Sequence, residues 1–186
     1  MAKTSRILGA LGVAALLLMV PVSAMASGKD LFEAVADSDS QALTVLLAAG
    51  EKADAPDARA EMEGLTPLMI AARIGDVEAV TALLAAGADP FAQDDAGRTP
   101  AWYAAFGEQY ETFSLLMALD GAEAIIDLPD TLTGNAMLHV AALSYEPRNV
   151  DILLSMGASQ DLANGFGQTP ADLCSVAVTP GCERLK

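Results

Sequence analysis

His139 is the only histidine of the chain and the first candidate for acid–base chemistry. A catalytic histidine commonly activates a serine or cysteine nucleophile, and no motif for such a nucleophile accompanies it. The sequence also lacks a glycine-rich phosphate loop, a set of residues with metal-ligand spacing and any cofactor motif. We therefore predict that the protein is not an enzyme, with no catalytic residue, no cofactor and no metal site.

An acidic run, DSDS at residues 37–40, has the first part of a calcium-loop pattern. Such a loop continues with a glycine and a distant glutamate, but here the pattern stops at Ser40. We interpret the run as a solvated turn between two helices.

His139 and residues 37–40 both belong to a series of predicted short helices. The sequence pattern of these helices is complete in residues 64–90, which read GLTPLMIAARIGDVEAVTALLAAGADP. Thr66 can cap a first helix that starts with Pro67, where the missing N–H does no harm. Asp76 can cap a second helix with apolar residues at helical spacing. Gly87 should end that helix, because glycine adopts the left-handed conformation without a Cβ penalty.

The same pattern recurs along the chain, with turn glycines separated by 33, 37 and 33 residues at Gly64, Gly97, Gly134 and Gly167. In addition, residues 29–50 superpose on residues 66–87 without a gap, but they lack the Gly-x-Thr-Pro turn and are expected to form an N-terminal cap. The last copy lacks a complete second helix. The motif G-x-T-P-L, followed by G, then L-L and then G-A-D, resembles the ankyrin repeat, whose period is about 33 residues.

This resemblance implies an all-α fold, an ankyrin-repeat solenoid of about five stacked helix-turn-helix repeats with short hairpin fingers. The turns should project on one side of the stack, with leucine pairs buried between repeats. The expected repeats are residues 27–60, 61–93, 94–130, 131–163 and 164–186. The expected buried leucines are Leu83, Leu84, Leu115, Leu116, Leu153 and Leu154.

His139 lies at the histidine position of the ankyrin repeat, so the resemblance implies that its ring hydrogen-bonds the turn backbone between repeats. Pro147 should start the second helix of its repeat. The loop before this repeat, residues 120–132, is four residues longer than the repeat requires. Pro129 should keep that loop extended rather than helical.

The third repeat has Trp102 at the histidine position and holds five of the nine aromatic residues of the chain. Aromatic residues at helical spacing more often fill a core than bind a ligand, and we favour that interpretation. The alternative is that they anchor a partner in an exposed groove.

The N-terminus has the pattern of a signal peptide at residues 1–26. Lys3 and Arg6 precede residues 7–20, which carry no charge and are too few for a membrane span of roughly 20 residues. Ala24 and Ala26 provide the small residues of a cleavage site, and the alternative is an uncleaved anchor. We expect cleavage after Ala26, export through the inner membrane and a periplasmic location.

Without this leader the chain has 25 acidic and 8 basic residues, a formal charge of −17. Such a surface repels phosphate, so nucleic acid and membranes are poor partners and a protein with a basic face is a better one. The alternative is that the charge only keeps the protein soluble.

Cys174 and Cys182 are the only cysteines. They lack the C-x-x-C spacing of redox pairs and a nearby histidine for zinc. Because export leads to an oxidising compartment, we favour a disulfide over two free thiols.

Ankyrin arrays are similar in role in many settings: they bind proteins through the fingers and the first helices of each repeat. The resemblance implies partner-binding residues in the turns at Met62, Glu63, Leu65, Asp95, Arg98, Leu132, Thr133, Asn135, Phe166 and Gln168, and in the first helices at Arg73, Ile74, Phe106, Leu143 and Ser144. Two functions are open. The first is a periplasmic module that serves as escort, inhibitor or immunity protein for one partner, acting as a monomer. The second is a structural or stabilising envelope component with no dedicated partner.

Overall fold

The computed structural model describes residues 30–54, 64–174 and 179–185. Within these ranges the chain forms nine α-helices and two short 3₁₀ helices, with no strand. The α-helices are α1 (Leu31–Ala36), α2 (Ser40–Ala48), α3 (Pro67–Ile74), α4 (Val77–Ala85), α5 (Pro100–Phe106), α6 (Tyr110–Met117), α7 (Met137–Leu143), α8 (Pro147–Ser155) and α9 (Pro170–Leu173); the 3₁₀ helices are η2 (Ala122–Ile125) and η3 (Pro180–Leu185).

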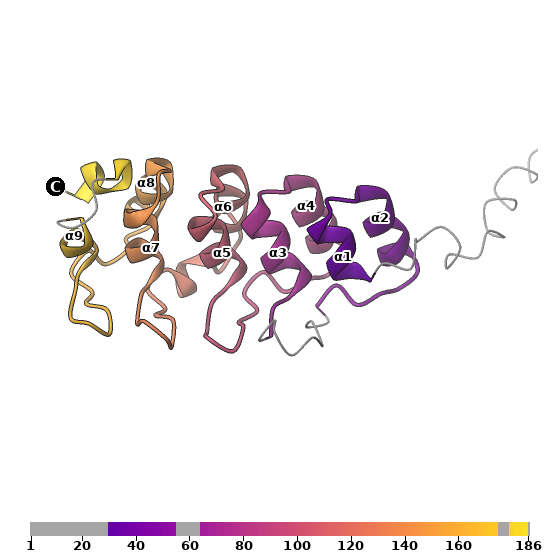
Figure 1. Cartoon of the computed structure of the whole chain (residues 1–186), viewed down its shortest axis with the longest axis horizontal. Helices are drawn as coiled ribbons and strands as arrows, with labels where there is room; N and C mark the ends of the chain where they lie inside the picture. The colour runs from indigo at the N-terminus through magenta and orange to yellow at the C-terminus, as the bar shows by residue number, and fades with distance from the viewer. Residues whose placement is uncertain (1–29, 55–63, 175–178, 186) are drawn as a thin grey trace, which may run out of the picture.

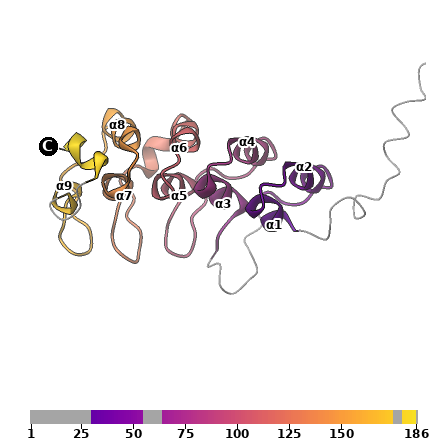
Figure 2. The same cartoon turned by 45° about the horizontal axis from the view of Figure 1, so that its top comes forward.

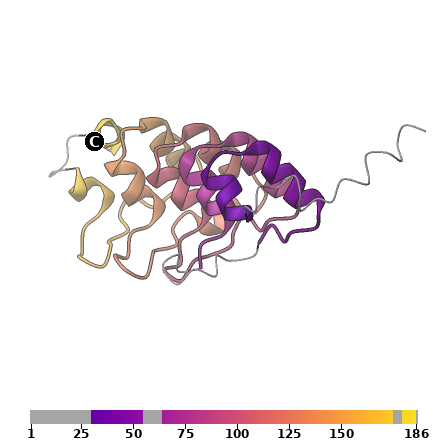
Figure 3. The same ribbon diagram turned by 45° about the vertical axis from the view of Figure 1, so that its right-hand side comes forward.

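The helices form two layers along an elongated stack. The first helices of the pairs, α1, α3, α5, α7 and α9, make one row, and α2, α4, α6 and α8 make the other (Figures 1 and 2). The turns that lead into α5, α7 and α9, which we call the fingers, all project on the same side (Figures 1 and 3). The predicted all-α solenoid is confirmed.

The predicted helix caps are present. The Thr66 hydroxyl accepts a hydrogen bond from the Met69 N–H at 3.3 Å, and the Asp76 carboxylate accepts one from the Ala79 N–H at 2.9 Å. These oxygens satisfy donors that have no partner within the first helical turn. Pro147 starts α8 as expected.

The leucine pairs are buried only in part. Leu83, Leu116 and Leu153 are at most 2% exposed, whereas Leu84, Leu115 and Leu154 are half-buried at the edge of the core, so the prediction was wrong for the latter three. Consecutive helical residues are separated by about 100° around the axis, since an α-helix has 3.6 residues per turn. Therefore only one leucine of each pair can face the first-helix layer.

The long loop before α7 is not wholly extended, which corrects the prediction from Pro129. Its first half forms η2, and Ala122, Ile125 and Ile126 are buried against the core. Burial of these apolar side chains explains the helical turn, because the extended conformation that Pro129 favours applies only to the residues next to it.

The C-terminal segment covers the end of the stack. A disulfide joins Cys174 and Cys182, as predicted, with their Cα atoms 5.2 Å apart. The Thr179 hydroxyl donates a hydrogen bond to the Ala142 carbonyl at 2.5 Å, and η3 packs against α7 and α8. In the described part of the chain no helix has the length and apolarity needed to cross a membrane. The predicted signal peptide and the predicted site residues Met62 and Glu63 lie outside the described residues.

Candidate functional site: a cavity between the third and fourth repeats

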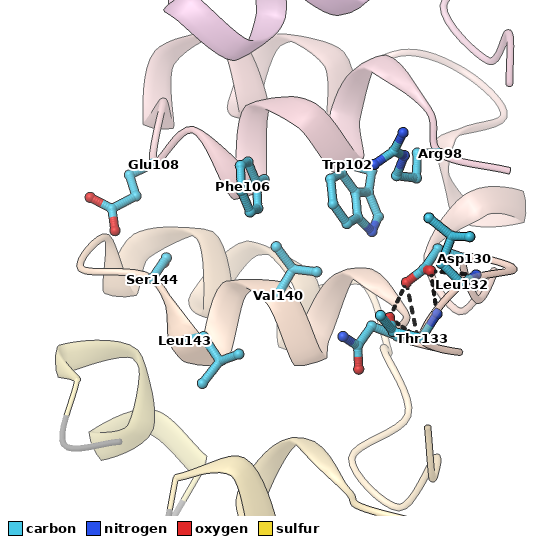
Figure 4. A pocket seen from close by; sticks show the side chains of 11 residues that line it. Arg98, Trp102, Phe106, Glu108, Asp130, Leu132, Thr133, Val140, Leu143 and Ser144 are labelled. Atoms are coloured by element: carbon cyan, nitrogen blue, oxygen red, sulfur yellow. Dashed lines mark hydrogen bonds between the residues drawn. The ribbon is translucent and has the colours of Figure 1, made fainter. Parts of the chain in front are cut away.

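A cavity of about 380 Å³ lies between α5 and α7 on the finger side of the stack (Figure 4). We call it the α5–α7 cavity. Its volume falls within the roughly 300–1,000 Å³ typical of ligand pockets. It is lined by Arg98, Trp102, Phe106, Glu108, Asp130, Leu132, Thr133, Asn135, Val140, Leu143 and Ser144.

The long walls of the cavity are apolar. Trp102 and Phe106 of α5 stack with ring centroids 5.4 Å apart and ring planes 12° from parallel. Val140 of α7 lies opposite them (Figure 4), and Leu143 of the same helix also belongs to the lining. Phe106 is 59% exposed and lies near other exposed apolar side chains. Contiguous exposed apolar groups of this kind often mark an interaction site. These walls can bury apolar side chains of a partner.

The aromatic residues of the third repeat thus divide between two roles. Phe113 and Tyr103 are buried in the core, as the favoured interpretation requires. Trp102 packs against the core with part of its ring and lines the cavity with the rest, whereas Phe106 is exposed in the cavity, so the core interpretation was wrong for Phe106. An indole ring has no acceptor nitrogen and cannot take the place of histidine in the turn.

Asp94, Arg98 and Tyr103 form a hydrogen-bonded polar cluster at the end of the cavity nearest the fingers. The Asp94 carboxylate accepts hydrogen bonds from Arg98 Nε at 2.7 Å and from the Tyr103 hydroxyl at 2.6 Å. Burial, together with this hydrogen bond to Asp94, raises the pKa of Tyr103 well above its ordinary value. The Arg98 guanidinium lies 5.4 Å from the centre of the Trp102 ring, in the range of a cation–π contact. Asp94 thus fixes Arg98, the only cation among the described residues that line the cavity.

The finger before α7 is organised by the Asp130 carboxylate. It accepts hydrogen bonds from the N–H groups of Leu132, Thr133 and Asn135 at 2.9, 2.7 and 3.1 Å, and from the Thr133 hydroxyl at 2.5 Å. Burial raises the pKa of Asp130, but these hydrogen bonds together outweigh it, so the pKa is lower than usual. Leu132, at the tip of this rigid turn, is 69% exposed.

This finger is one residue longer than its neighbours. Its closing hydrogen bond runs from Asp130 N–H to the Asn135 carbonyl, whereas the preceding finger closes from Asp94 N–H to the Arg98 carbonyl. Leu132 lies in this longer finger and lines the cavity.

Glu108 lies at the end of the cavity away from the fingers (Figure 4). Its φ of 61° is in the left-handed region, where the preceding repeat has Gly75 with φ of 81°. Its carboxylate accepts a hydrogen bond from the Tyr145 N–H at 2.8 Å. A non-glycine residue in this conformation costs about 1–2 kcal/mol, so the contact across repeats offsets local strain.

His139 is fully buried and bridges two repeats, as the resemblance implied. Its Nδ1 accepts a hydrogen bond from the Ala136 N–H at 3.3 Å, so the proton is on Nε2, which donates to the Gln168 carbonyl at 3.0 Å. Both ring nitrogens are therefore used in the structure. Among the described residues, no three His, Cys, Asp or Glu side chains form a group that could hold a metal ion.

The structure places the predicted partner-binding residues in two groups. Those that line the α5–α7 cavity are Arg98, Phe106, Leu132, Thr133, Asn135, Leu143 and Ser144. Those that lie outside its lining are Leu65, Arg73, Ile74, Asp95, Phe166 and Gln168.

The sequence prediction missed four residues of the lining: Trp102, Glu108, Asp130 and Val140. Trp102 could have been identified from the sequence, because it replaces the histidine that the repeat usually has at this position. Glu108 carried another signal, because it stands where the preceding repeat has Gly75.

Comparison with known proteins agrees with this architecture. Residues 31–130, more than half of the chain, match the family of ankyrin repeats, in 3 copies. The chain is 38% identical over 112 residues, 60% of its length, to Tyrosine-protein kinase HTK16 of Hydra vulgaris, but spans only 14% of that protein. It is 37% identical over 106 residues, 57% of its length, to Cyclin-dependent kinase 4 inhibitor B of Rattus norvegicus and of Mus musculus, spanning 78% of each.

The chain belongs to the ankyrin-repeat family. The repeats of this family are protein-interaction modules, and they bind protein partners.

Proposed function

We propose that this protein is an exported, monomeric module that binds one partner protein in the periplasm, as its escort, inhibitor or immunity protein. The observation that carries the proposal is the α5–α7 cavity, where exposed Phe106, Leu132 and Leu143 surround a space bounded by rigid polar turns. Rigid apolar groups next to fixed polar ones are typical of protein-binding surfaces.

Two features support export. Residues 1–26 have the charge, apolar stretch and small residues of a cleavable signal peptide. The Cys174–Cys182 disulfide is of the kind that persists in oxidising compartments.

The formal charge of −17 after cleavage supports a partner with a basic face. Two of the similar proteins are named as inhibitors of a cyclin-dependent kinase, which gives inhibition a precedent among ankyrin-repeat proteins. The inhibitor role is therefore the first to test once a partner is found.

Affinity capture from periplasmic extract, followed by mass spectrometry, tests the proposal when wild-type protein and Leu143→Glu are used side by side. Leu143 is 41% exposed, so a charge there should block the cavity without unfolding α7. The proposal requires a protein that the wild type retains and the variant loses. If every retained protein also binds the variant, or if none is retained, the second function, a structural envelope component, is favoured.

Export is tested separately by cell fractionation and mass measurement of the protein. We expect a periplasmic protein whose first residue is Ser27. An uncleaved chain in the membrane fraction would contradict this part of the proposal.

A further inference from the structure

The indole Nε1 of Trp102 is a buried hydrogen-bond donor that has no acceptor among the described residues. An indole nitrogen can only donate, and buried donors in native proteins nearly always have a partner. The ring lines the α5–α7 cavity, and its nitrogen lies on the side of the finger that carries Asp130 and Thr133 (Figure 4). The Asp130 carboxylate is already used by four donors of its own finger. An acceptor oxygen of a molecule in the cavity would satisfy Nε1.

The Glu108 carboxylate, at the opposite end of the cavity, is a second polar group with unused hydrogen-bonding capacity. Its carboxylate is exposed and receives a single described hydrogen bond, from the Tyr145 N–H, whereas a carboxylate has about four acceptor positions. Within the described residues, the ion pairs are formed by Arg98, Arg148 and Arg184 with other carboxylates. Glu108 can therefore accept a cation from outside.

The charge around the cavity points in the same direction. Glu108 and Asp130 belong to the lining, and Arg98, the one cation among the described lining residues, is held by the Asp94 carboxylate at 2.7 Å. The excess negative charge favours a cationic group over an anionic one.

We propose that the occupant of the cavity is a basic and apolar segment of the partner protein, an inference that rests on the proposed function. An aliphatic side chain of the segment packs between the Trp102–Phe106 wall and the Val140–Leu143 wall. A backbone carbonyl of the segment accepts the hydrogen bond of Trp102 Nε1. A neighbouring Lys or Arg side chain of the segment pairs with Glu108.

A random peptide library displayed on phage tests the chemistry without a known partner. Periplasmic wild-type protein and Leu143→Glu are used as parallel targets. We expect enrichment, on the wild type only, of peptides in which Lys or Arg neighbours Leu, Ile, Val or Met. Enrichment of acidic or uncharged peptides that need the intact cavity would overturn this inference and leave the proposed function standing. Absence of any peptide that distinguishes the two targets would count against both.

The indole N–H gives a direct readout, because Trp102 is the only tryptophan and has one indole resonance in a ¹⁵N-labelled protein. Titration with a selected synthetic peptide should move this resonance downfield, as expected for a new hydrogen bond. Trp102→Phe retains an aromatic ring but has no donor, so it should lower the affinity for the peptide about fivefold, the effect of one hydrogen bond. Binding that moves α5 and α7 resonances but neither moves the indole signal nor responds to Trp102→Phe would overturn the role of Nε1.

The role of Glu108 has its own pair of variants. Glu108→Gln should remove the advantage of a basic peptide over the same peptide with Gln in place of Lys or Arg. Glu78→Gln is the matched control, since Glu78 is exposed on α4 in the other helix layer. An unchanged preference in Glu108→Gln, or an equal change in Glu78→Gln, would overturn the proposed ion pair.

Discussion

The third position of α3, α5, α7 and α9 carries a different side chain in each repeat, and in three of the four it accepts a hydrogen bond from the N–H of the capping residue. Met69 accepts a hydrogen bond from the Thr66 N–H through its sulfur at 3.4 Å, and Asp172 accepts one from the Thr169 N–H at 2.9 Å. His139 does the same for its own turn and also reaches the next repeat. Trp102 cannot accept, and it lines the cavity instead.

His139→Ala should lower the free energy of unfolding by about 2–4 kcal/mol, because it leaves a buried N–H and a carbonyl without partners and creates a cavity. Urea denaturation measures this change. Met69→Leu is the matched control, with an expected cost of about 1.5 kcal/mol, because the volume is conserved and only the weak hydrogen bond from the Thr66 N–H to the Met69 sulfur is lost. Equal losses in the two variants would show that the bridge to Gln168 adds nothing.

Asp130→Asn should destabilise the protein at neutral pH by about 1–2 kcal/mol, because an amide replaces one of the two carboxylate oxygens by a donor. The pKa of Asp130 is lowered in the folded protein, so its stabilising contribution is complete above the pKa of the unfolded chain, roughly 4. The contribution is lost as the pH falls from there through the folded pKa. Urea denaturation of both proteins from pH 7 to pH 3 should therefore show a difference that shrinks in acid. A difference that grows in acid would contradict this account.

At the scale of the helix pairs, the sequence predicted most of what local chemistry decides. Threonine, aspartate, proline and glycine act on their own turn, so the starts at Pro67 and Pro147 could be predicted from short patterns. The turn η2 could not, because it depends on burial of Ile125 and Ile126 against distant helices. The cavity was predicted in part, since position in the repeat identifies finger residues such as Leu132 but does not decide which side chains of neighbouring repeats enclose a cavity.

Because neighbouring repeats pack closely at Gly107, substitution by alanine should destabilise the protein more there than at a glycine with positive φ. A Cβ at Gly107 would lie 2.3 Å from the Arg73 carbonyl oxygen, although its φ of −77° suits any residue. Gly87 has φ of 91°, and a Cβ added there would meet nothing within 4 Å. We expect Gly107→Ala to lower the free energy of unfolding by about 3 kcal/mol and Gly87→Ala by about 1–2 kcal/mol, as measured by urea denaturation. The reverse order would show that the repeats can separate at low cost.

The disulfide should hold η3 over the end of the stack. Cys182 is 3% exposed, and its link to Cys174 closes a loop with a sequence separation of 8. Loop closure of this length stabilises by about 2.5 kcal/mol on the chain-entropy model. Reduction, or the double substitution Cys174→Ser and Cys182→Ser, should lower the melting temperature in a thermal scan. Two reactive thiols in the unreduced, denatured protein would contradict the bond itself.

At the scale of the whole molecule, acidic charge and a small apolar cavity should affect different steps of binding. Exposed charges act over a Debye length of about 8 Å at physiological ionic strength, so they steer encounter with a basic partner. Apolar contacts, once formed, mainly set the dissociation rate. Raising the salt concentration should therefore slow association with the captured partner while changing dissociation little, as measured by surface plasmon resonance. Association that is indifferent to salt would contradict electrostatic steering.

The most direct test of the central claim, that the α5–α7 cavity binds the partner, compares two exposed apolar residues at finger tips. Leu132 is 69% exposed and lines the cavity, whereas Phe166 is 73% exposed and lies outside its lining. The measurement is the dissociation constant of the captured partner for Leu132→Ala and Phe166→Ala, with melting temperatures as a check on folding. We expect about 2 kcal/mol of lost binding for Leu132→Ala, near 30-fold, little loss for Phe166→Ala, and no change in either melting temperature. A loss confined to Phe166→Ala, or full affinity in both variants, would place the binding surface elsewhere on the molecule.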